Sequence, residues 1–364
     1  MPSQPSLRVI HILPRLTRGG AETMVLDLIK QASPAIEPLL VSLKPLDAGG
    51  EEMAASLGPV RLHVIGQRYP GDVMALWRLY RFLKKEQPSI IHTHLFGADL
   101  YGGLAARLAG LSQILSTEHS TGLPSGLRLA LKRRLFRWSR VAVAVSEAVR
   151  QTLIARGFSS SKLRLIHNGV AAERFTRRET ASSDVFRIGA IGRLAPEKNL
   201  ARLIEAVAVL AEQGNVHCSI AGEGPLRASL EKLIKEKGLV GRVELVGRIN
   251  DVPTFMSKLD AFVLPSLWEG MPLALLEAGA AGLPCVASDI PGVQEVISDG
   301  ETGLLIDPQS SAAIAQSLER LRRSPEDCHR FGKALRQHVT SSFSVSWMAE
   351  AYEKLYREIL SSSL

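Results

Sequence analysis

The feature that most constrains the fold is an alternation, along almost the whole chain, of short apolar runs with longer amphipathic segments. Short apolar runs bounded by turn residues predict buried strands, and apolar residues three and four apart predict helices. Strands that alternate with helices imply parallel sheets covered on both faces. We expect strands at residues 8–13, 38–44, 61–66, 90–95, 113–119, 141–146, 163–168, 186–191, 217–221, 243–246, 261–265, 284–288 and 304–306.

The segments between these runs predict the helices. We expect helices around residues 21–29, 72–86, 98–109, 126–138, 147–156, 200–213 and 347–356. Two further helices are expected to begin at Pro225 and Pro272, because proline is favoured at the first helical position. The pattern as a whole predicts an α/β chain of doubly wound, Rossmann-like sheets.

A chain of 364 residues predicts two domains. Residues 171–185 are polar and poor in apolar side chains, so we interpret them as the linker between a domain at 1–170 and a domain at 186–345. The three cysteines have no metal-like spacing, and residues 1–6 do not resemble a secretory signal, so a reducing cytoplasm is expected. No apolar run reaches the roughly 20 residues that span a bilayer.

The positive charge is concentrated in the first half of the chain. Residues 1–180 hold 25 Lys and Arg against 13 Asp and Glu, although the net charge of the whole chain is only +8. Such asymmetry indicates a partner that is nucleic acid, an anionic membrane or an anionic substrate. Nucleic acid is disfavoured because no aromatic interleaving or nucleic-acid motif accompanies the charge.

The main basic element is the segment 127–140. Its expected helix places Leu127, Leu131, Leu135 and Trp138 on one face, with Arg128, Lys132 and Arg137 mostly off that face. The segment is either an ordinary helix with a solvated cationic face or a surface for anionic lipid or a pyrophosphate. Four more cations, Arg78, Arg81, Lys84 and Lys85, extend the same basic surface in the second interpretation.

Ligands of doubly wound folds bind at the carboxyl ends of the strands. This rule draws attention to residues that end the first-half strands, namely His94, Glu118, His119, Ser146, Asn168 and Gly169. His119 stands out because a polar cluster ends its strand where a helix is expected to begin. The loop after the first strand ends in Gly19 and Gly20, without the G-x-G-x-x-G pattern, so it is either a plain tight turn or a ligand loop.

In the second half, cations and carboxylates flank two expected helix starts. Arg193 and Lys198 lie on one loop and form either a surface pair or a clamp for a diphosphate. Glu269 precedes and Glu277 follows the helix start near Pro272, where the backbone N–H groups of residues 270–273 favour an anion. Two carboxylates on either side of an anion site fit a sugar nucleotide, and the alternative is plain surface charge.

With these pieces in order, the chain resembles a retaining glycosyltransferase of family 4 with the GT-B fold. The resemblance covers nearly the whole chain and rests on six motifs that occur in the family's order and spacing. They are Gly19-Gly20-Ala21-Glu22, Thr117-Glu118-His119, Asn168-Gly169-Val170, Gly192-Arg193-Leu194 with Glu197-Lys198-Asn199, Ala221-Gly222-Glu223-Gly224-Pro225, and Glu269-x7-Glu277.

The resemblance implies two Rossmann-like domains that face each other across a cleft. The C-terminal domain would bind a nucleotide sugar, by family preference a UDP-sugar, and the N-terminal domain the acceptor. The last helix, in residues 346–364, would return to the N-terminal domain. Transfer of a hexose or N-acetylhexosamine would retain the anomeric configuration and need no metal or other cofactor. The acceptor would be a glycan or a polyprenyl-diphosphate-linked glycan for cell-surface polysaccharide or lipopolysaccharide, met at the inner face of the cell membrane.

The resemblance also implies roles for individual residues. Arg193 and Lys198 match the diphosphate clamp, with Glu269 facing the sugar hydroxyls, Glu277 binding the ribose and His119 reaching the donor sugar. The other matched positions, all expected to contact donor or acceptor, are Gly19, Gly20, Asn168, Glu223, Arg248, Ile249, Gly270, Met271, Pro272 and Leu273.

The chain departs from the family pattern at one point. Gly270-Met271 stands where many relatives carry Phe-Gly, which leaves the contacts to the sugar open. Two alternatives remain, another GT-B sugar-nucleotide enzyme such as an epimerase and a non-enzymatic interaction protein that uses the basic helix. A nicotinamide oxidoreductase is excluded because residues 222–227 carry proline and arginine where a dinucleotide fingerprint needs helix N–H groups and a third glycine.

Overall fold

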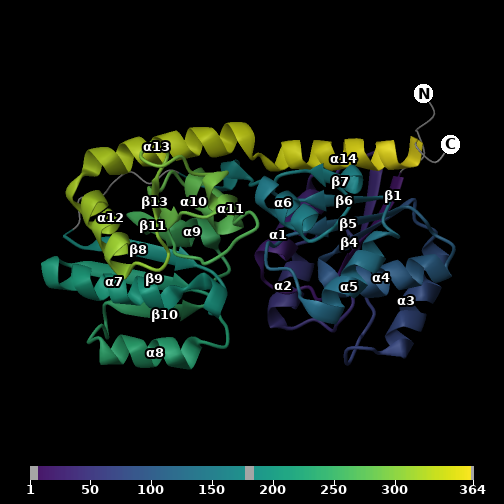
Figure 1. Cartoon of the computed structure of the whole chain (residues 1–364), viewed down its shortest axis with the longest axis horizontal. Helices are drawn as coiled ribbons and strands as arrows, with labels where there is room; N and C mark the ends of the chain where they lie inside the picture. The colour runs from purple at the N-terminus through teal and green to yellow at the C-terminus, as the bar shows by residue number, and fades with distance from the viewer. Residues whose placement is uncertain (1–6, 177–183, 362–364) are drawn as a thin grey trace. The chain divides into compact units, whose positions relative to one another are not determined.

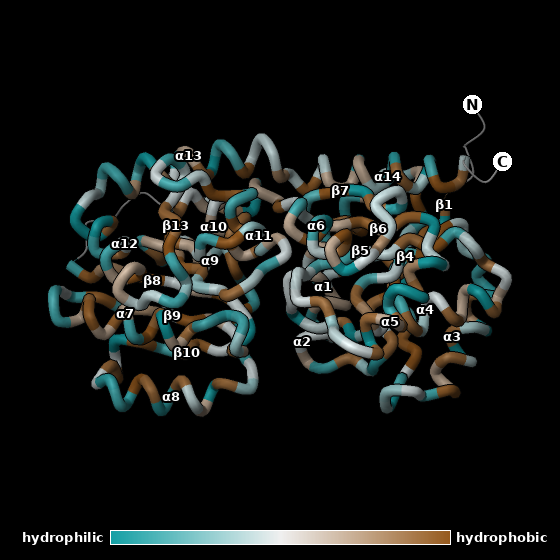
Figure 2. Tube along the Cα trace, viewed as in Figure 1, coloured by the Kyte–Doolittle hydropathy of each residue, from teal (hydrophilic) through white to brown (hydrophobic). Residues whose placement is uncertain are grey.

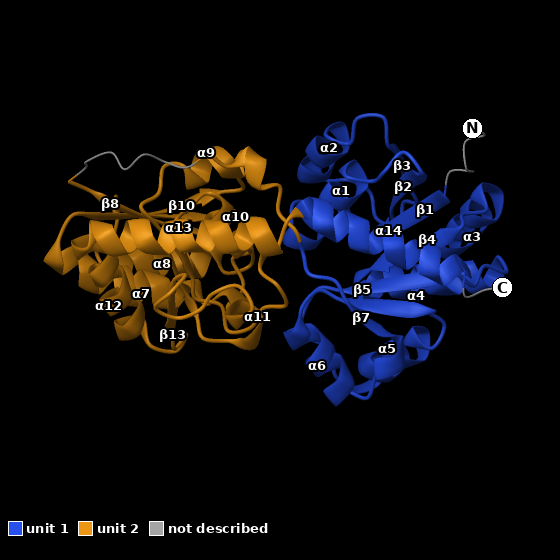
Figure 3. Ribbon diagram, turned by 90° about the horizontal axis from the view of Figure 1, so that it is seen from above, with its two compact units in different colours: residues 1–168, 345–364 blue, residues 169–344 orange. Residues whose placement is uncertain are grey.

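The computed structural model describes residues 7–176 and 184–361 and divides into two compact units (Figure 3). Unit 1 comprises residues 1–168 and 345–364, and unit 2 comprises residues 169–344. Residues 177–183 of the predicted linker lie outside the described residues. The preceding residues belong to unit 2, where Ala172–Arg174 forms a short 3-10 turn, η2, and Phe175 is buried.

Unit 1 is built on a parallel sheet (Figure 1), whose seven strands follow the order β3-β2-β1-β4-β5-β6-β7. Its central strands are mostly buried because helices cover both faces, although β4 and β5 each carry three polar residues. The strands are β1 Leu7–Leu13, β2 Ile36–Ser42, β3 Arg61–Val64, β4 Ile90–His94, β5 Ile114–Glu118, β6 Val141–Ala144 and β7 Leu163–Leu165. The helices are α1 Gly20–Lys30, α2 Ala48–Ala55, α3 Val73–Glu86, α4 Leu95–Leu108, α5 Gly126–Phe136, α6 Glu147–Ala155 and the 3-10 turn η1 Ser160–Lys162.

The last helix, α14 Val345–Ser361, packs on unit 1. Tyr352 and Tyr356 are its largest buried side chains. The hydroxyl of Tyr356 lies 2.8 Å from Nδ1 of His92 on β4, and that of Tyr352 lies 3.2 Å from Oγ1 of Thr117 on β5. The helix therefore returns to the N-terminal unit, as the resemblance implied, and does so through polar contacts inside the core.

Unit 2 repeats the architecture with six parallel strands in the order β10-β9-β8-β11-β12-β13. The strands are β8 Phe186–Ile191, β9 Val216–Ala221, β10 Val243–Gly247, β11 Ala261–Leu264, β12 Cys285–Ser288 and β13 Leu304–Ile306. The helices are η3 Pro196–Lys198, α7 Leu200–Gln213, α8 Arg227–Glu236, α9 Val252–Met256, α10 Leu273–Ala280, α11 Pro291–Gln294, α12 Ser311–Arg323 and α13 Pro325–Ser342.

The hydropathy of the chain follows this layering. The tube of Figure 2 alternates between teal and brown along α8, whose Leu230 and Ile234 are buried, so one face of the helix packs on the sheet. No helix within residues 7–176 and 184–361 is long and apolar enough to cross a membrane.

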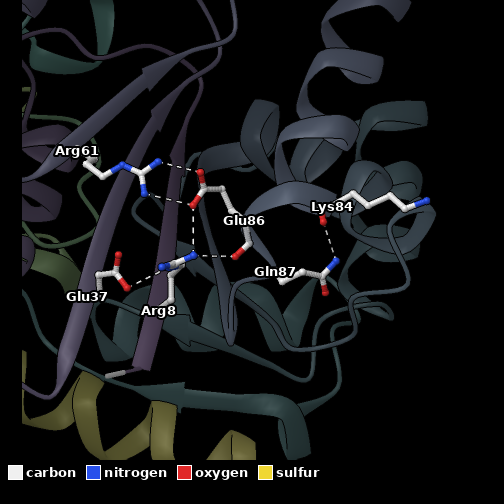
Figure 4. Close-up of polar contacts among 6 residues, drawn as sticks. All are labelled: Arg8, Glu37, Arg61, Lys84, Glu86 and Gln87. Carbon is white, nitrogen blue, oxygen red and sulfur yellow. Dashed lines mark hydrogen bonds and ion pairs between the residues drawn. The ribbon is translucent and has the colours of Figure 1, made fainter. Parts of the chain in front are cut away.

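An ion-pair network joins the amino-terminal ends of β1, β2 and β3 to the last residue of α3 (Figure 4). Arg61 on β3 donates to both carboxylate oxygens of Glu86 at 2.8 and 3.2 Å, and these hydrogen bonds lower the pKa of Glu86. Arg8 on β1 donates to Glu37 at 3.0 Å and to the backbone oxygen of Glu86 at 3.0 Å. These cations belong to the fold, so they do not add to a free basic surface.

Several predicted boundaries are wrong by one to three residues. The helices expected at Pro225 and Pro272 begin at Arg227 and Leu273, and the strand expected at 163–168 ends at Leu165. Proline supplied the predicted start of both helices, but Pro272 is the N-cap of α10 and Pro225 lies two residues before the first residue of α8. The patterns above predict none of α2, α12 and α13.

Candidate functional site

In each sheet the strand order reverses once, and candidate residues follow the strands that flank the reversal. The reversal lies between β1 and β4 in unit 1 and between β8 and β11 in unit 2. In doubly wound folds ligands bind at such switch points, beyond the carboxyl ends of the strands. Gly19 and Gly20 follow β1 and His94 ends β4, while Arg193 follows β8 and Glu269 follows β11.

The switch point of unit 2 holds a lysine–glutamate pair. Nζ of Lys198 lies 2.5 Å from Oε1 of Glu269, and Oγ of the buried Ser266 donates to the same oxygen at 2.7 Å. The side chains of Lys198 and Glu269 are 22% and 11% exposed, so the pair borders solvent. Glu269 is thus held by two donors, while the lysine carries its charge at the edge of the loop.

Backbone contacts hold the two loops of this pair together. Asn199 follows Lys198 with φ 52°, and its Nδ2 donates to the carbonyl oxygens of Pro265 at 3.1 Å and Pro308 at 2.6 Å. The N–H of Leu267 donates to the carbonyl of Glu197 at 2.8 Å. Arg193, on the same loop as Lys198, is exposed. The sequence prediction that Arg193 and Lys198 share a loop at a helix entrance is confirmed in its geometry.

A glycine-rich loop packs beside Arg193. Gly222 has φ 141°, and a Cβ there would lie 1.9 Å from the carbonyl oxygen of Gly192, so any side chain would push the two loops apart. The N–H of Leu194 donates to the carbonyl of Glu223 at 3.0 Å. The carboxylate of Glu223 accepts from Arg227 at 2.8 Å.

The loop after β10 lies beside the glycine-rich loop. The N–H of Gly222 donates to the carbonyl of Gly247 at 2.7 Å. Arg248 and Ile249 directly follow Gly247 in the sequence, so they also lie near the glycine-rich loop. Arg248 is exposed and Ile249 is half-buried. The loops after β8, β9 and β10 therefore lie side by side, and whether they bind the base stays a prediction.

The start of α10 completes this edge. Pro272 is the N-cap, no side chain caps the helix within the part of the chain that the structure describes, and Gly270, Met271 and Leu273 are buried. Glu277 is the fifth helical residue and is half-buried. A Cβ on Gly292 of α11 would lie 2.4 Å from the carbonyl of Gly270, so α11 presses on the loop before α10. An uncapped helix start with nearby cations can hold a phosphate.

In unit 1, Gly19 is the extended N-cap of α1, and Glu22 folds back toward it. A Cβ on Gly19 would lie 2.4 Å from Oε2 of Glu22, so a side chain there would displace the carboxylate. Burial raises the pKa of Glu22 to about 7. In the sequence, Glu22 appears only as part of the Gly19-Gly20-Ala21-Glu22 motif, and nothing there indicates a raised pKa. Glu22 is therefore a candidate site residue that sequence reasoning missed.

His119 follows β5 and is half-buried. Its Nε2 lies 3.4 Å from Nδ1 of His94, while its Nδ1 is buried without a hydrogen-bond partner among the described residues. Burial and the charge of Lys132 lower the pKa of His119 to about 3, so the ring is neutral. A neutral ring with an unused buried nitrogen is suited to bind a polar ligand group.

Three further histidines lie behind it. Among the described residues, ring nitrogens of His11, His92 and His94 lie within 4.8 Å of one another, which is close enough for the three side chains to bind one metal ion. However, both nitrogens of His92 are engaged, with Tyr356 and Thr117 at 2.8 Å each. His94 likewise contacts His11 at 3.2 Å and His119 at 3.4 Å. An ion would have to replace these hydrogen bonds.

The structure corrects the cationic face expected in the segment 127–140 at Lys132 alone, because Arg128 and Arg137 are exposed as expected. Lys132 is buried and forms an ion pair with Glu118 at the end of β5, and the side chains are 7% and 10% exposed. Burial alone would lower the pKa of Lys132, but the charges of Glu118 and Asp99 and the hydrogen bond to Glu118 raise it. Leu127, expected on the same apolar face as Leu131 and Leu135, is 87% exposed.

The remaining predicted positions divide between the units. Asn168 is buried at the end of unit 1, beyond β7, and Gly169 begins unit 2. Arg78, counted in the basic surface, donates to the carbonyls of Ile65 at 2.9 Å and Gly66 at 3.1 Å and so serves the fold. The structure thus brings together Arg193, Lys198, Glu223 and Glu269 on contacting loops of unit 2.

Family models match both units. The model described as "Glycosyltransferase Family 4" matches residues 18–174, and that described as "Glycosyl transferases group 1" matches residues 172–338. The chain is 30% identical to alpha-D-kanosaminyltransferase of Streptomyces kanamyceticus over 81% of this chain and 84% of that protein. It is 29% identical to an Escherichia coli UDP-Gal:alpha-D-GlcNAc-diphosphoundecaprenol alpha-1,3-galactosyltransferase over 79% of this chain and 80% of that protein.

The crystal structure of Anabaena HepE in complex with UDP and glucose has the same fold, with a TM-score of 0.86 and 19% identity over 96% of this chain and 99% of that one. Two parallel Rossmann-like sheets, the returning α14 and this likeness confirm the predicted GT-B fold. Together with the two family models, these similarities show that the chain is a glycosyltransferase and belongs to family 4.

Proposed function

We propose that the chain transfers a hexose or N-acetylhexosamine from a UDP-sugar to a lipid-linked glycan, with retention of anomeric configuration and without a metal. The observation that carries the proposal is the switch point of unit 2, where Lys198 and Glu269 form a pair beside the exposed Arg193 and the uncapped start of α10. This places cations, a carboxylate and helix N–H groups along one edge.

The cations suit the leaving group. When the glycosidic bond breaks, the nucleoside diphosphate gains negative charge, which fixed donors stabilise without reorganising. Arg193 offers a planar fork, Lys198 a point charge, and the first turn of α10 its N–H groups. We assign these three elements to the diphosphate, so the protein itself provides the charge that a metal provides in other transferases.

The carboxylates suit hydroxyl groups. Glu269, held by Lys198 and Ser266, is assigned to the sugar, and Glu277 to the ribose. Arg248 and Ile249 are assigned to the base, with Glu223 beside them. In unit 1, Gly19, Gly20, Asn168 and His119 are assigned to the acceptor and the donor sugar, as the resemblance implies. We assign no side chain as a covalent nucleophile. Instead, we propose that the acceptor attacks the anomeric carbon on the same face from which the phosphate leaves, and that the leaving phosphate assists this attack.

The relatives support the class of donor and acceptor. The Escherichia coli relative is named for UDP-Gal and a diphosphoundecaprenol acceptor, and the Anabaena structure contains UDP and glucose. We infer the same classes here and propose that the chain acts in cell-surface polysaccharide or lipopolysaccharide synthesis, in the cytoplasm at the inner face of the membrane.

The surface of α3 supports contact with that membrane. Large apolar side chains on this helix and the loop before it are exposed, namely Tyr69, Val73, Met74 and Trp77. The guanidinium carbon of Arg81 lies 4.9 Å from the ring centre of Trp77, and the exposed Lys84 and Lys85 follow. Exposed aromatic and apolar groups beside cations are typical of helices that lie on anionic lipid.

Vesicle binding tests this part of the proposal. We expect the purified protein to bind vesicles with phosphatidylglycerol more tightly than neutral vesicles, with binding that weakens as salt rises. Trp77→Asp should weaken it strongly, whereas Trp347→Asp, which alters an exposed tryptophan on α14, should not. Equal behaviour of the two variants would remove α3 as the contact surface.

A thermal-shift panel of UDP, GDP, ADP and common UDP-sugars tests the donor site. A ligand at 100 times its Kd stabilises the folded state by about 2.7 kcal/mol, which is readily measured. We expect UDP or a UDP-sugar to stabilise the wild type and neither Arg193→Ala nor Glu277→Ala. The controls Arg202→Ala and Glu212→Ala alter charged residues of α7 and should respond like the wild type.

Kinetics then test the chemistry. Arg193→Ala and Lys198→Ala should each lose about 2–4 kcal/mol of transition-state stabilisation, as for the loss of one oxyanion donor. The anomeric configuration of the product, read by NMR, decides retention, and activity after chelation by EDTA decides metal dependence. Near wild-type turnover in either variant would reject the diphosphate clamp, and an inverted product would reject retention.

A further inference from the structure

A chain of hydrogen-bonded histidines leads through the core of unit 1 to His119. Nδ1 of His11 on β1 lies 3.2 Å from Nε2 of His94, and Nδ1 of His94 lies 3.4 Å from Nε2 of His119. His11 and His94 are at most 2% exposed. At the end of the chain, Nδ1 of His119 is buried and has no hydrogen-bond partner among residues 7–176 and 184–361.

The three rings are neutral. Burial lowers the pKa of His11 to about 3, and burial with the nearby Lys132 does the same for His119. Burial, followed by the neighbouring His92, His11 and His119, lowers the pKa of His94 well below its ordinary value. A neutral imidazole donates from one nitrogen and accepts at the other.

Two hydrogen bonds between three neutral rings allow only two arrangements of the protons. In the first, His119 donates from Nε2 to His94, His94 donates to His11, and Nδ1 of His119 carries a lone pair. In the second, all donors are reversed and Nδ1 of His119 carries the proton. The partner of a histidine's other nitrogen therefore decides what the free nitrogen presents to a ligand.

We propose that His94, supported by His11, is a positioning residue that fixes His119 in the tautomer protonated at Nε2. This rests on the proposed function, in which His119 contacts the donor sugar. Positive charge develops at the anomeric carbon as the glycosidic bond breaks, and a lone pair at Nδ1 complements this charge whereas an N–H opposes it. His94 thus acts on the reaction through His119, without touching the substrate.

The neighbouring His92 offers a matched control. It lies two residues before His94 on the same strand, is equally buried, and hydrogen-bonds to Tyr356 and Thr117 instead of to His119. Replacing either histidine with phenylalanine removes polar contacts from the same layer of the core. Only the change at His94 breaks the link to His119.

The first experiment is ¹⁵N NMR of the histidine side chains, with the His119 signals assigned from His119→Asn. In the wild type we expect His119 to be protonated at Nε2 and unprotonated at Nδ1. His94→Phe should mix the two tautomers and His92→Phe should not. His94→Asn keeps an acceptor oxygen close to the position of Nδ1 and should restore the wild-type tautomer.

Kinetics provide the second measurement. His94→Phe should lower kcat by about 10- to 100-fold, the loss typical of an outer partner that orients a functional histidine, with little change in KM. His92→Phe should retain kcat once folded protein is counted by circular dichroism, and His94→Asn should recover most of the loss.

Three results would overturn the proposal. They are a wild-type His119 protonated at Nδ1, a His94→Phe variant whose tautomer and kcat match those of His92→Phe, and stoichiometric Zn²⁺ binding that His94→Phe abolishes. Because the NMR measurement needs neither donor nor acceptor, it tests the positioning role even if the nucleotide panel rejects the proposed function.

Discussion

Each unit holds a lysine–glutamate pair near the carboxyl ends of its sheet, and the two pairs differ in their surroundings. Lys132 and Glu118 of unit 1 are buried between α5 and β5, with side chains 7% and 10% exposed. Lys198 and Glu269 of unit 2 join two loops, and the lysine is 22% exposed. Glu269 is as enclosed as Glu118, so the difference between the pairs lies in the lysine, which is buried in unit 1 and borders solvent in unit 2.

The difference extends to the whole of each core. Fifteen described polar or charged side chains are buried in unit 1, whereas in the described part of unit 2 only Ser266 and Ser288 are. None of the described histidines of unit 2 is buried, while His11, His92 and His94 lie inside unit 1. The buried polar and ionisable side chains thus lie mainly in the core of unit 1, whereas the lysine–glutamate pair of unit 2 lies on the loops that follow its strands.

Acid should therefore unfold unit 1 before unit 2. The buried histidines have folded pKa values below the unfolded value of about 6.5, so the unfolded state binds more protons below that pH. Each group then removes up to about 1.4 kcal/mol of stability for each pH unit below 6.5. The four groups are the buried His11, His92 and His94 and the half-buried His119.

Pulse proteolysis in urea, with peptides from each unit identified by mass spectrometry, measures both units in one sample. Between pH 7.5 and 5.5 the urea midpoint of unit 1 should fall much more than that of unit 2. His92→Phe should reduce the slope by one histidine's share. A parallel loss in both units would contradict the comparison.

The next largest effect should come from breaking the buried pair. Lys132→Met leaves the carboxylate of Glu118 buried without its cation, which costs about 3–5 kcal/mol. Removing both charges, in Lys132→Met with Glu118→Leu, should recover much of this loss because no charge stays buried. Chemical denaturation of the three proteins measures the free energies of unfolding. If the double variant is as unstable as the single one, packing rather than charge explains the cost.

A smaller effect is expected at Glu22, whose carboxyl group at the start of α1 has a raised pKa. Since burial raises its pKa from 4.5 to about 7, the folded state holds more protons between these values, and stability falls as pH rises through this window. Glu22→Gln should thus be more stable than the wild type at pH 8 by about 1–3 kcal/mol, with the difference vanishing near pH 4.5. Melting temperatures across this range measure it, and Glu51→Gln on the exposed face of α2 is the control.

Most strands of both units could be predicted because parallel strands covered on both faces are largely apolar, although β4 and β5 also hold buried polar residues. All thirteen predicted strands are present within the described residues, and only their ends differ. The helix α2 was missed because its first turn contains Gly49 and Gly50, both buried, which lack the apolar spacing of a helix.

The candidate site of unit 2 was predictable for a related reason. Arg193, Lys198 and Glu269 follow predicted strands directly, so the rule for strand ends already brings them to one edge. The polar contacts inside unit 1 could not be predicted, because the two residues of each contact come from elements that are far apart in the sequence. Nothing near Lys132 in the chain indicates that it meets Glu118, and the spacing of His92 and His94 places them on one face without revealing that they have different partners.

The smallest effect on stability should come from the Lys198–Glu269 pair at the solvent edge of unit 2, and it separates stability from activity. Lys198→Met removes an ion pair at the solvent edge, where such pairs contribute about 0–1 kcal/mol, and Ser266 still donates to Glu269. The free energy of unfolding should hence change by less than about 1 kcal/mol, whereas we expect turnover to fall because the proposed phosphate contact is lost. Chemical denaturation beside Lys132→Met gives the comparison directly. If Lys198→Met destabilised unit 2 as strongly as Lys132→Met destabilises unit 1, the unit 2 pair would be a structural one, and its assignment to the diphosphate would lose its physical basis.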